Sequence, residues 1–209
     1  MSALHPYLRA GDGVIDVGAN DGHYATGYAK VVGPTGCVVA VEPDPKTADL
    51  CRARCTPWPM VRVVQAAVSC CAGMATLYRD SDHRRHSLWE ANTITKTGDA
   101  VSVPMVTLDS LAVDVPHLTA IKIDAQGAEA QILAGATETL TNPALTWAVE
   151  LWAQGLTDAG SSVDAVIDVF EAHGWHPVGS TWDQVRPKAR IKNGHGAIDV
   201  LLQHAERSH

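Results

Sequence analysis

One short loop near the N-terminus constrains the fold of this chain more than any other feature. Residues 14–24 read VIDVGANDGHY, an apolar stretch that carries Asp16, then a tight loop with Gly18 and Gly22, then the start of a helix-like segment. In this order the strand brings its acid to the carboxyl edge of a sheet. The first glycine lets the backbone approach a ligand, and the second lets the helix pack near the strand. The loop therefore predicts a cradle for a nucleotide-like ligand.

The spacing of the glycines separates this loop from two common nucleotide-binding loops. The dinucleotide motif G-x-G-x-x-G would need glycine at positions that hold Asn20 and His23, and no Gly-Lys-Ser/Thr of a phosphate-binding P-loop follows. A cationic ligand without a pyrophosphate fits the loop better. S-adenosylmethionine, which has an ammonium group and a sulfonium, is such a ligand. A tight turn that binds no ligand is the alternative for the loop taken alone.

An acid after the next apolar stretch supports the same interpretation. Residues 38–43 read VVAVEP, and Glu42 lies 26 residues after Asp16. An acid about 20 residues beyond the glycine loop lies where the ribose of a nucleoside would be, and a carboxylate can accept hydrogen bonds from both ribose hydroxyls. The alternative is that Glu42 only ends a strand before Pro43. The joint occurrence of both signals at βαβ spacing disfavours it.

Strand and helix patterns alternate through most of the chain. The predicted strands cover residues 14–17, 38–42, 61–64, 120–124, 145–151, 175–178 and 197–202. The predicted helices cover residues 23–32, 46–54, 128–134 and 161–173. Buried strands that alternate with helices predict an α/β fold with a parallel sheet covered on both faces. The ligand should lie at the carboxyl ends of the strands, where the strand order reverses.

Two segments break this rhythm. Residues 70–106 show no helical period, and short strands at 74–78 and 101–106 flank a polar stretch at 79–99. An insertion this long is expected to be either functional, for example as a lid, or disordered. Residues 182–193 are interpreted as a second loop, and both segments are expected to determine the choice of substrate.

Composition and charge narrow the function classes. The 209 residues, 46% apolar and 19% charged, are expected to form a single domain over residues 1–209. The net charge of −7 disfavours nucleic acid as a partner, because phosphate binding needs a basic surface. Neither a membrane span nor a signal peptide is recognisable, so a cytoplasmic protein is expected. The odd number of cysteines, five, indicates free thiols.

Several motifs together resemble one enzyme family. They are VIDVGANDG at 14–22, the acid-proline pair at 42–43, AVS at 67–69, TLDSL at 107–111 and IKIDAQGAE at 121–129. In this combination the chain resembles the FkbM-type S-adenosylmethionine-dependent methyltransferases. The resemblance implies a Rossmann-like class I methyltransferase fold with a seven-stranded sheet. It also implies methyl transfer to a hydroxyl group, often on a natural-product scaffold or a sugar.

The resemblance assigns cofactor contacts to individual residues. The cofactor loop falls on Asp16, Gly18, Ala19, Asn20 and Gly22, the ribose acid on Glu42 with Pro43 beside it, and the adenine-proximal turn on Ala66 and Ala67. Asp124 is expected beside the methionine end of the cofactor, because it ends the strand next to the point where the strand order reverses. The expected partner is a small hydroxylated acceptor.

Methyl transfer from a sulfonium needs little chemistry from the protein. Catalysis consists mainly of holding the acceptor oxygen in line with the methyl group, and a nearby base removes the hydroxyl proton. Asp124 is the first candidate for this base, Glu150 the second and His86, from the insertion, the third. Alternatives are that Asp124 caps the following helix, that Glu150 pairs with Lys122, and that His86 is solvated.

Other questions stay open at this stage. Trp152 and Trp182 are expected near the loops, where they could line an acceptor pocket, whereas Trp147 and Trp175 are expected in the core. A divalent metal held by Asp124, Glu150 and His86 is conceivable and is left unassigned. A homodimer is compatible with the sequence. The competing functions are a nicotinamide-dependent oxidoreductase and a nucleoside-binding domain without catalysis.

Overall fold

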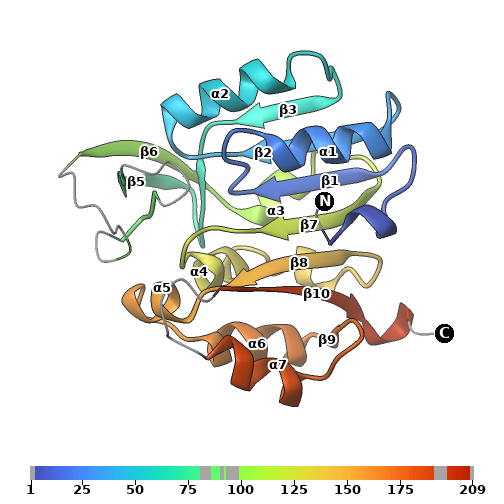
Figure 1. The fold of residues 1–209 in the computed structure, drawn as a ribbon, viewed down its shortest axis with the longest axis vertical. Coiled ribbons are helices and arrows are strands. Elements are labelled where there is room, and N and C mark those ends of the chain that lie inside the picture. Colours follow the sequence, from blue (N-terminus) through green and yellow to red (C-terminus); the bar gives the residue numbers. More distant parts are fainter. Residues whose placement is uncertain (1–2, 81–85, 90–91, 93–98, 191–196, 208–209) are drawn as a thin grey trace.

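A seven-stranded sheet forms the centre of the molecule (Figure 1). The computed structural model describes residues 3–80, 86–89, 92, 99–190 and 197–207. The strand order is β3-β2-β1-β7-β8-β10-β9, and every pairing from β3 to β8 is parallel, whereas β10 is antiparallel to both of its neighbours. The strands are β1 (Gly13–Val17), β2 (Cys37–Val41), β3 (Val61–Val64), β7 (Leu118–Ile123), β8 (Thr146–Leu151), β9 (Trp175–Pro177) and β10 (Ile198–His204). The expected mostly parallel seven-stranded sheet is confirmed.

Alternate residues of the buried strands supply two separate cores. Val14 and Val38 face one side, where α1 (His23–Val32) and α2 (Pro45–Cys55) pack. Ile15 and Val39, one position further along each strand, face the other side and join the core that includes residues of α4 (Glu129–Ala134), α6 (Val163–Ala172) and α7 (Trp182–Ala189). This two-residue period places helices on both faces of the sheet.

The inserted segment forms a small second sheet of order β4-β6-β5. Its strands are β4 (Ala67–Val68), β5 (Gly73–Tyr78) and β6 (Ala100–Val106). Figure 1 shows β5 and β6 beyond the carboxyl ends of β1 and β7. The expected short strands are therefore present, and most of the polar stretch between them lies outside the described residues.

Three helices were not expected from the sequence. They are α3 (Leu108–Ala112), α5 (Ala153–Asp158) and α7. The loop expected at 182–193 is wrong for residues 182–189, which form α7, and residues 191–193 lie outside the described part of the chain. Thr181 and Gln184 form a capping box at the start of α7. Pro187 lies within this helix, and because proline is unfavourable in a helix interior the sequence pattern did not predict α7.

Candidate active site

The glycine loop lies directly against the end of β7. Gly18 has a left-handed φ of 74°, and a Cβ at this position would lie 1.8 Å from the carbonyl oxygen of Asp124. Gly22 is also left-handed, with φ of 83°, but a Cβ there would lie 2.9 Å from Cys51 Sγ on α2. Gly18 therefore permits close approach of two loops, and Gly22 permits the packing of two helices.

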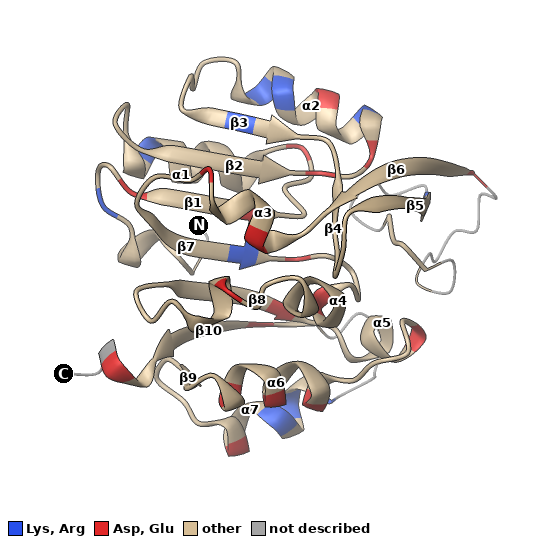
Figure 2. Ribbon diagram, turned by 180° about the vertical axis from the view of Figure 1, so that it is seen from behind, with Lys and Arg blue, Asp and Glu red and all other residues tan. Residues whose placement is uncertain are grey.

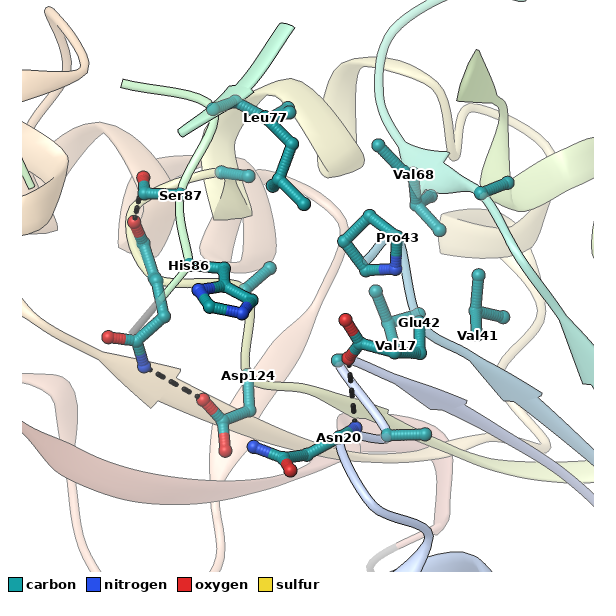
Figure 3. Close-up of a pocket in the computed structure, with 18 of the residues that line it drawn as sticks. Val17, Asn20, Val41, Glu42, Pro43, Val68, Leu77, His86, Ser87 and Asp124 are labelled. Atoms are coloured by element: carbon teal, nitrogen blue, oxygen red, sulfur yellow. Dashed lines mark hydrogen bonds between the residues drawn. The ribbon is translucent and has the colours of Figure 1, made fainter. Parts of the chain in front are cut away.

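A cavity of about 530 Å³ opens at the carboxyl ends of the central strands. Figure 3 shows its residues coming from the loops after β1, β2 and β7 and from the insertion. The predicted residues that line it are Gly18, Ala19, Asn20, Glu42, Pro43, Ala66, Ala67, His86, Asp124 and Glu150. Asp16 and Gly22, which were also predicted to contact the cofactor, do not belong to this lining; Asp16 lies buried beneath the loop and Gly22 faces α2. The lining residues to which the sequence assigned no role include Tyr24, Leu77, Ser87, Leu88 and Gln126.

Glu42 lies at the start of the loop after β2, with its carboxylate on the pocket wall. One oxygen accepts a hydrogen bond from the backbone N–H of Asn20 and the other from that of Asp44, both at 3.0 Å. The first of these bonds is drawn in Figure 3. Burial raises the pKa of Glu42 to about 7, against the effect of the two hydrogen bonds. Each oxygen keeps a lone pair for a further donor.

The insertion is anchored to this same loop by an ion pair. Arg79, at the end of β5, donates from Nε to Oδ2 of the buried Asp44 at 2.5 Å. Asp44 also accepts a hydrogen bond from the backbone N–H of Thr47 and thereby caps α2. This contact ties the inserted sheet to the wall that carries Glu42.

Asp16 and Lys122 form a buried ion pair beneath the pocket. Lys122 Nζ lies 3.8 Å from Asp16 and 3.1 Å from Asp124, and its ammonium is 5.0 Å from the ring centroid of Tyr24. Neither carboxylate oxygen of Asp16 has a hydrogen-bond partner within the described structure. Burial raises the pKa of Asp16 to about 6, although Lys122 opposes that rise. Lys122 thus pairs with Asp16 and Asp124, and no such pair joins it to Glu150.

Asp124 and Glu150 meet in the pocket and are bridged by one amide. Gln126 Nε2 donates to Asp124 Oδ1 at 3.2 Å and to Glu150 Oε2 at 3.1 Å. Burial and the neighbouring Asp124 carboxyl raise the pKa of Glu150 to about 9, which favours the protonated form of Glu150 at neutral pH. Burial alone would raise the pKa of Asp124. The Lys122 ammonium and the hydrogen bonds that Asp124 accepts instead hold this pKa below its usual value. The opposite directions of the two pKa shifts favour one carboxylate, on Asp124, and one carboxylic acid, on Glu150.

Asp124 does not cap the helix that follows it. The N-cap of α4 is Ala128, and no side chain bonds to that end. Instead Glu129, fully buried, accepts hydrogen bonds from the backbone N–H groups of Ala125 at 3.1 Å and Gly127 at 3.4 Å. Burial raises the pKa of Glu129 to about 7. Glu129 therefore holds the loop that presents Asp124 and Gln126.

His86 reaches the pocket from the insertion. Figure 3 shows its imidazole in the region bounded by Asp124, Asn20 and Glu42. Its Nδ1 accepts a hydrogen bond from the backbone N–H of Asp80 at 3.0 Å. A neutral imidazole with this acceptor carries its proton on Nε2. The structure thus places His86 at the pocket, and its role as a base stays a prediction.

The tryptophans expected near the loops do not line the cavity. Trp182 is buried at the start of α7 and donates from Nε1 to the carbonyl of Trp175 at 3.0 Å. The ring of Trp152 packs over Gly155 in its own turn. Trp147 and Trp175 are fully buried in the core, as expected.

Other expectations from the sequence concern thiols, metals and membranes. All five cysteines are free thiols. Within the described residues, no group of three or more His, Cys, Asp or Glu side chains is arranged to hold a metal ion. Among the helices of that same part of the chain, none has the length and apolar character needed to span a bilayer.

Comparisons with known proteins relate this chain to methyltransferases. A model described as the methyltransferase FkbM domain matches residues 16–201. The chain is 24% identical over 172 residues to the 2-O-methyltransferase NoeI of Sinorhizobium fredii. The aligned region covers 75% of this chain and 70% of that relative.

Solved structures share the fold. An FkbM methyltransferase from Methylobacillus flagellatus superposes with a TM-score of 0.56 at 15% identity, covering 95% of this chain and 45% of the other. Fibrillarin from Aeropyrum pernix, solved with natively bound S-adenosylmethionine, gives a TM-score of 0.54 at 12% identity, covering 93% and 67%. The fold is thus the Rossmann-like class I methyltransferase fold.

Proposed function

Because the chain belongs to the FkbM methyltransferase family and is therefore an S-adenosylmethionine-dependent methyltransferase, we propose that it methylates a hydroxyl group of a neutral small molecule. A sugar or another natural-product scaffold is the proposed acceptor. The observation that carries this proposal is the pairing of Asp124 with Glu150 in one pocket, bridged by Gln126.

The pocket has the features that S-adenosylmethionine requires. Its volume of about 530 Å³ falls in the usual range for small-molecule sites. Gly18 lets the loop pack against the Asp124 carbonyl, where a Cβ would collide, and Glu42 keeps lone pairs for a ribose diol. We assign the loop residues Gly18, Ala19 and Asn20 to the cofactor, together with Glu42. Pro43, Ala66 and Ala67 are assigned to the adenine side, and Asp124 to the methionine end. The bound cofactor would supply a methyl group on a sulfonium, which is already a good leaving group.

Asp124 is the proposed base. Its lowered pKa favours the ionised form, because the Lys122 ammonium and the hydrogen bond from Gln126 stabilise its negative charge. Its carboxylate can accept the proton of an acceptor hydroxyl. Glu150, whose raised pKa favours its protonated form at neutral pH, would orient the acceptor through hydrogen bonds, and His86 lines the same pocket.

The charges around the pocket favour a neutral acceptor. Among its described lining residues there are acids but no Lys or Arg, and Lys122 beneath the pocket is already paired with Asp16 and Asp124, so none of these residues offers a free counter-charge to an anionic acceptor. Figure 2 shows Lys and Arg residues on α2 and α7, towards opposite ends of the molecule. On α7, Arg186 is already paired with Asp164, Asp168 and Glu171 of α6. The nicotinamide-dependent alternative is not favoured, since the family uses a different cofactor.

A transfer assay tests the proposal. S-adenosylmethionine with a labelled methyl group is incubated with methyl glucoside, a phenol, an amine and a nucleoside monophosphate as separate acceptors. We expect label in an ether of a neutral hydroxylated acceptor and inhibition by S-adenosylhomocysteine. Label on the amine or the nucleotide alone would contradict the proposed acceptor class. Binding of S-adenosylmethionine without transfer to any acceptor would favour the domain without catalysis.

A further inference from the structure

Asn92, from the insertion, joins three segments that are far apart in the sequence. Its Nδ2 lies 2.9 Å from the carbonyl oxygen of Gln126, 3.2 Å from that of Gly155 and 3.3 Å from Ser87 Oγ. Ser87 Oγ in turn donates to the Gln126 carbonyl at 3.2 Å, a bond drawn in Figure 3. The Gln126 peptide is therefore held from the insertion by two side chains.

The local backbone leaves space for this contact. Gly127 has a φ of 100°, and a Cβ there would lie 2.7 Å from Asn92 Nδ2 and 2.6 Å from the carbonyl of Gly155. Asn92 is buried, and its Oδ1 has no hydrogen-bond partner in the described part of the chain. A buried, unpartnered carbonyl costs free energy. The contribution of Asn92 thus lies in the hydrogen bonds that its amide N–H groups donate.

Gln126 itself adopts a strained conformation. Its φ of 51° is in the left-handed region, which is unfavourable for a residue with a side chain and persists where surrounding contacts enforce it. The contacts on its carbonyl are those from Ser87 and Asn92. The same residue places its side-chain amide between Asp124 and Glu150.

We propose that Asn92 is a positioning residue for the acid pair: by holding the Gln126 carbonyl it keeps the Gln126 amide between Asp124 and Glu150. The inserted segment then determines the arrangement of the two carboxyl groups in addition to lining the pocket. The role of this arrangement in catalysis rests on the proposed function, whereas the contact between Asn92 and the Gln126 carbonyl is independent of that function.

The acid pair reports on this arrangement through its titration. The Gln126 amide is among the groups that lower the pKa of Asp124, so its displacement raises that pKa. The other charged groups that act on the pair are Lys122 and Asp16 in the sheet, Glu129 on α4 and Asp199 on β10. None of these is bonded to Asn92. His86 of the insertion also faces Asp124, and the double variant with Gln126 distinguishes an effect through Gln126 from one through His86.

A double-mutant cycle tests the proposal without any acceptor. The intact protein is labelled with ¹³C at the Asp and Glu carboxyls and titrated by NMR as wild type, Asn92→Ala, Gln126→Ala and the double variant. Resonances are assigned by their loss in Asp124→Asn and Glu150→Gln. We expect Asn92→Ala to move the titration of the pair to higher pH, and the double variant to match Gln126→Ala alone. S-adenosylhomocysteine affinity at pH 8 should change by less than about twofold, the usual scatter for independent sites.

Two further variants complete the test. Asn142→Ala removes an exposed asparagine whose side chain, within the described residues, accepts a hydrogen bond from the Ala144 N–H of its own turn, and should leave the titration unchanged. Ser87→Ala removes one hydrogen bond to the Gln126 carbonyl and should give a smaller shift in the same direction, which keeps the test informative if Asn92→Ala does not fold. A wild-type titration in Asn92→Ala and Ser87→Ala, or additive shifts in the double variant, would overturn the proposal. Failure of methyl transfer to hydroxyls would instead overturn the proposed function and leave this titration result standing.

Discussion

The Lys122 ammonium lies between two carboxylates, 3.1 Å from Asp124 at the pocket and 3.8 Å from Asp16 beneath it. One buried cation thus serves both the candidate base and the acid of the glycine loop. Without the Lys122 ammonium the two carboxylates would repel each other. Lys122 therefore links the stability of the fold to the ionisation of Asp124 in the pocket.

Replacement of Lys122 by methionine tests this link. At pH 7 we expect Lys122→Met to lower the free energy of unfolding by about 3–5 kcal/mol, as is usual when one partner of a buried ion pair is removed. The loss should shrink at pH 5, where the orphaned carboxyls take up protons. Urea unfolding at both pH values measures it, with the exposed Lys46→Met as the control. Equal losses for the two variants at pH 7 would contradict the importance of the buried pair.

Glu42 is expected to make cofactor binding depend on pH. Its carboxylate accepts hydrogen bonds better when ionised, and burial raises its pKa to about 7, so S-adenosylhomocysteine should bind more tightly as the pH rises from 5.5 to 7.5. Glu42→Ala should weaken binding by roughly 1–3 kcal/mol at pH 7.5 and flatten the pH dependence. Calorimetry measures both. A folded variant with unchanged affinity would mean that Glu42 only ends its strand.

Asp124→Asn distinguishes a base from a cofactor contact. The amide keeps the shape of the side chain but cannot accept a proton from the hydroxyl. If Asp124 is the base, kcat should fall by about 10²–10⁴-fold with cofactor affinity retained. If it instead holds the ammonium of the cofactor, binding should weaken and the saturated rate should be spared. Normal rate and affinity would exclude both roles and shift attention to Glu150 and His86.

Gly18→Ala tests the close approach of the two loops. A Cβ at Gly18 would lie 1.8 Å from the Asp124 carbonyl, whereas a Cβ at Gly33 would meet nothing within 4 Å, although φ is positive at both glycines. Gly33→Ala should therefore cost only the backbone strain of its φ of 66° and ψ of −170°, about 1–3 kcal/mol, with no steric clash. Gly18→Ala should abolish S-adenosylhomocysteine binding or unfold the loop. Similar thermal stability and binding in the two variants would contradict the steric argument.

The protein without ligand should become less stable as the pH rises from about 4.5 to 7. The pKa values of Asp16, Glu42 and Glu129 are raised by burial to about 6, 7 and 7, above the 3.8 and 4.5 expected in the unfolded chain. The folded state therefore binds more protons than the unfolded state in this interval, and its stability falls as the pH rises through it. Urea unfolding from pH 4.5 to 7.5 measures the slope. Glu129→Gln should reduce that slope, and a rising stability across the interval would contradict the raised pKa values.

Much of the fold follows from patterns that are local in the sequence. The apolar stretch and glycines around Asp16 predicted β1, the loop and α1, because Gly18 and Gly22 supply conformations that other residues adopt at a cost. The same holds for Glu42, which directly follows a buried strand at the expected spacing. Local patterns failed where they conflicted, as at α7, whose capping box and internal proline point to opposite conclusions.

Some residues of the candidate site could likewise be named from the sequence, whereas their contacts could not. Asp124 and Glu150 could be named from the sequence, because each stands at the carboxyl end of a strand and parallel strands bring those ends together. The tertiary structure alone placed Gln126 between them, separated Asp16 from the pocket and gave Lys122 two carboxylate partners. It also brought Asn92 to the Gln126 carbonyl. These contacts join side chains across several elements, and only packing determines which of many distant polar groups meet.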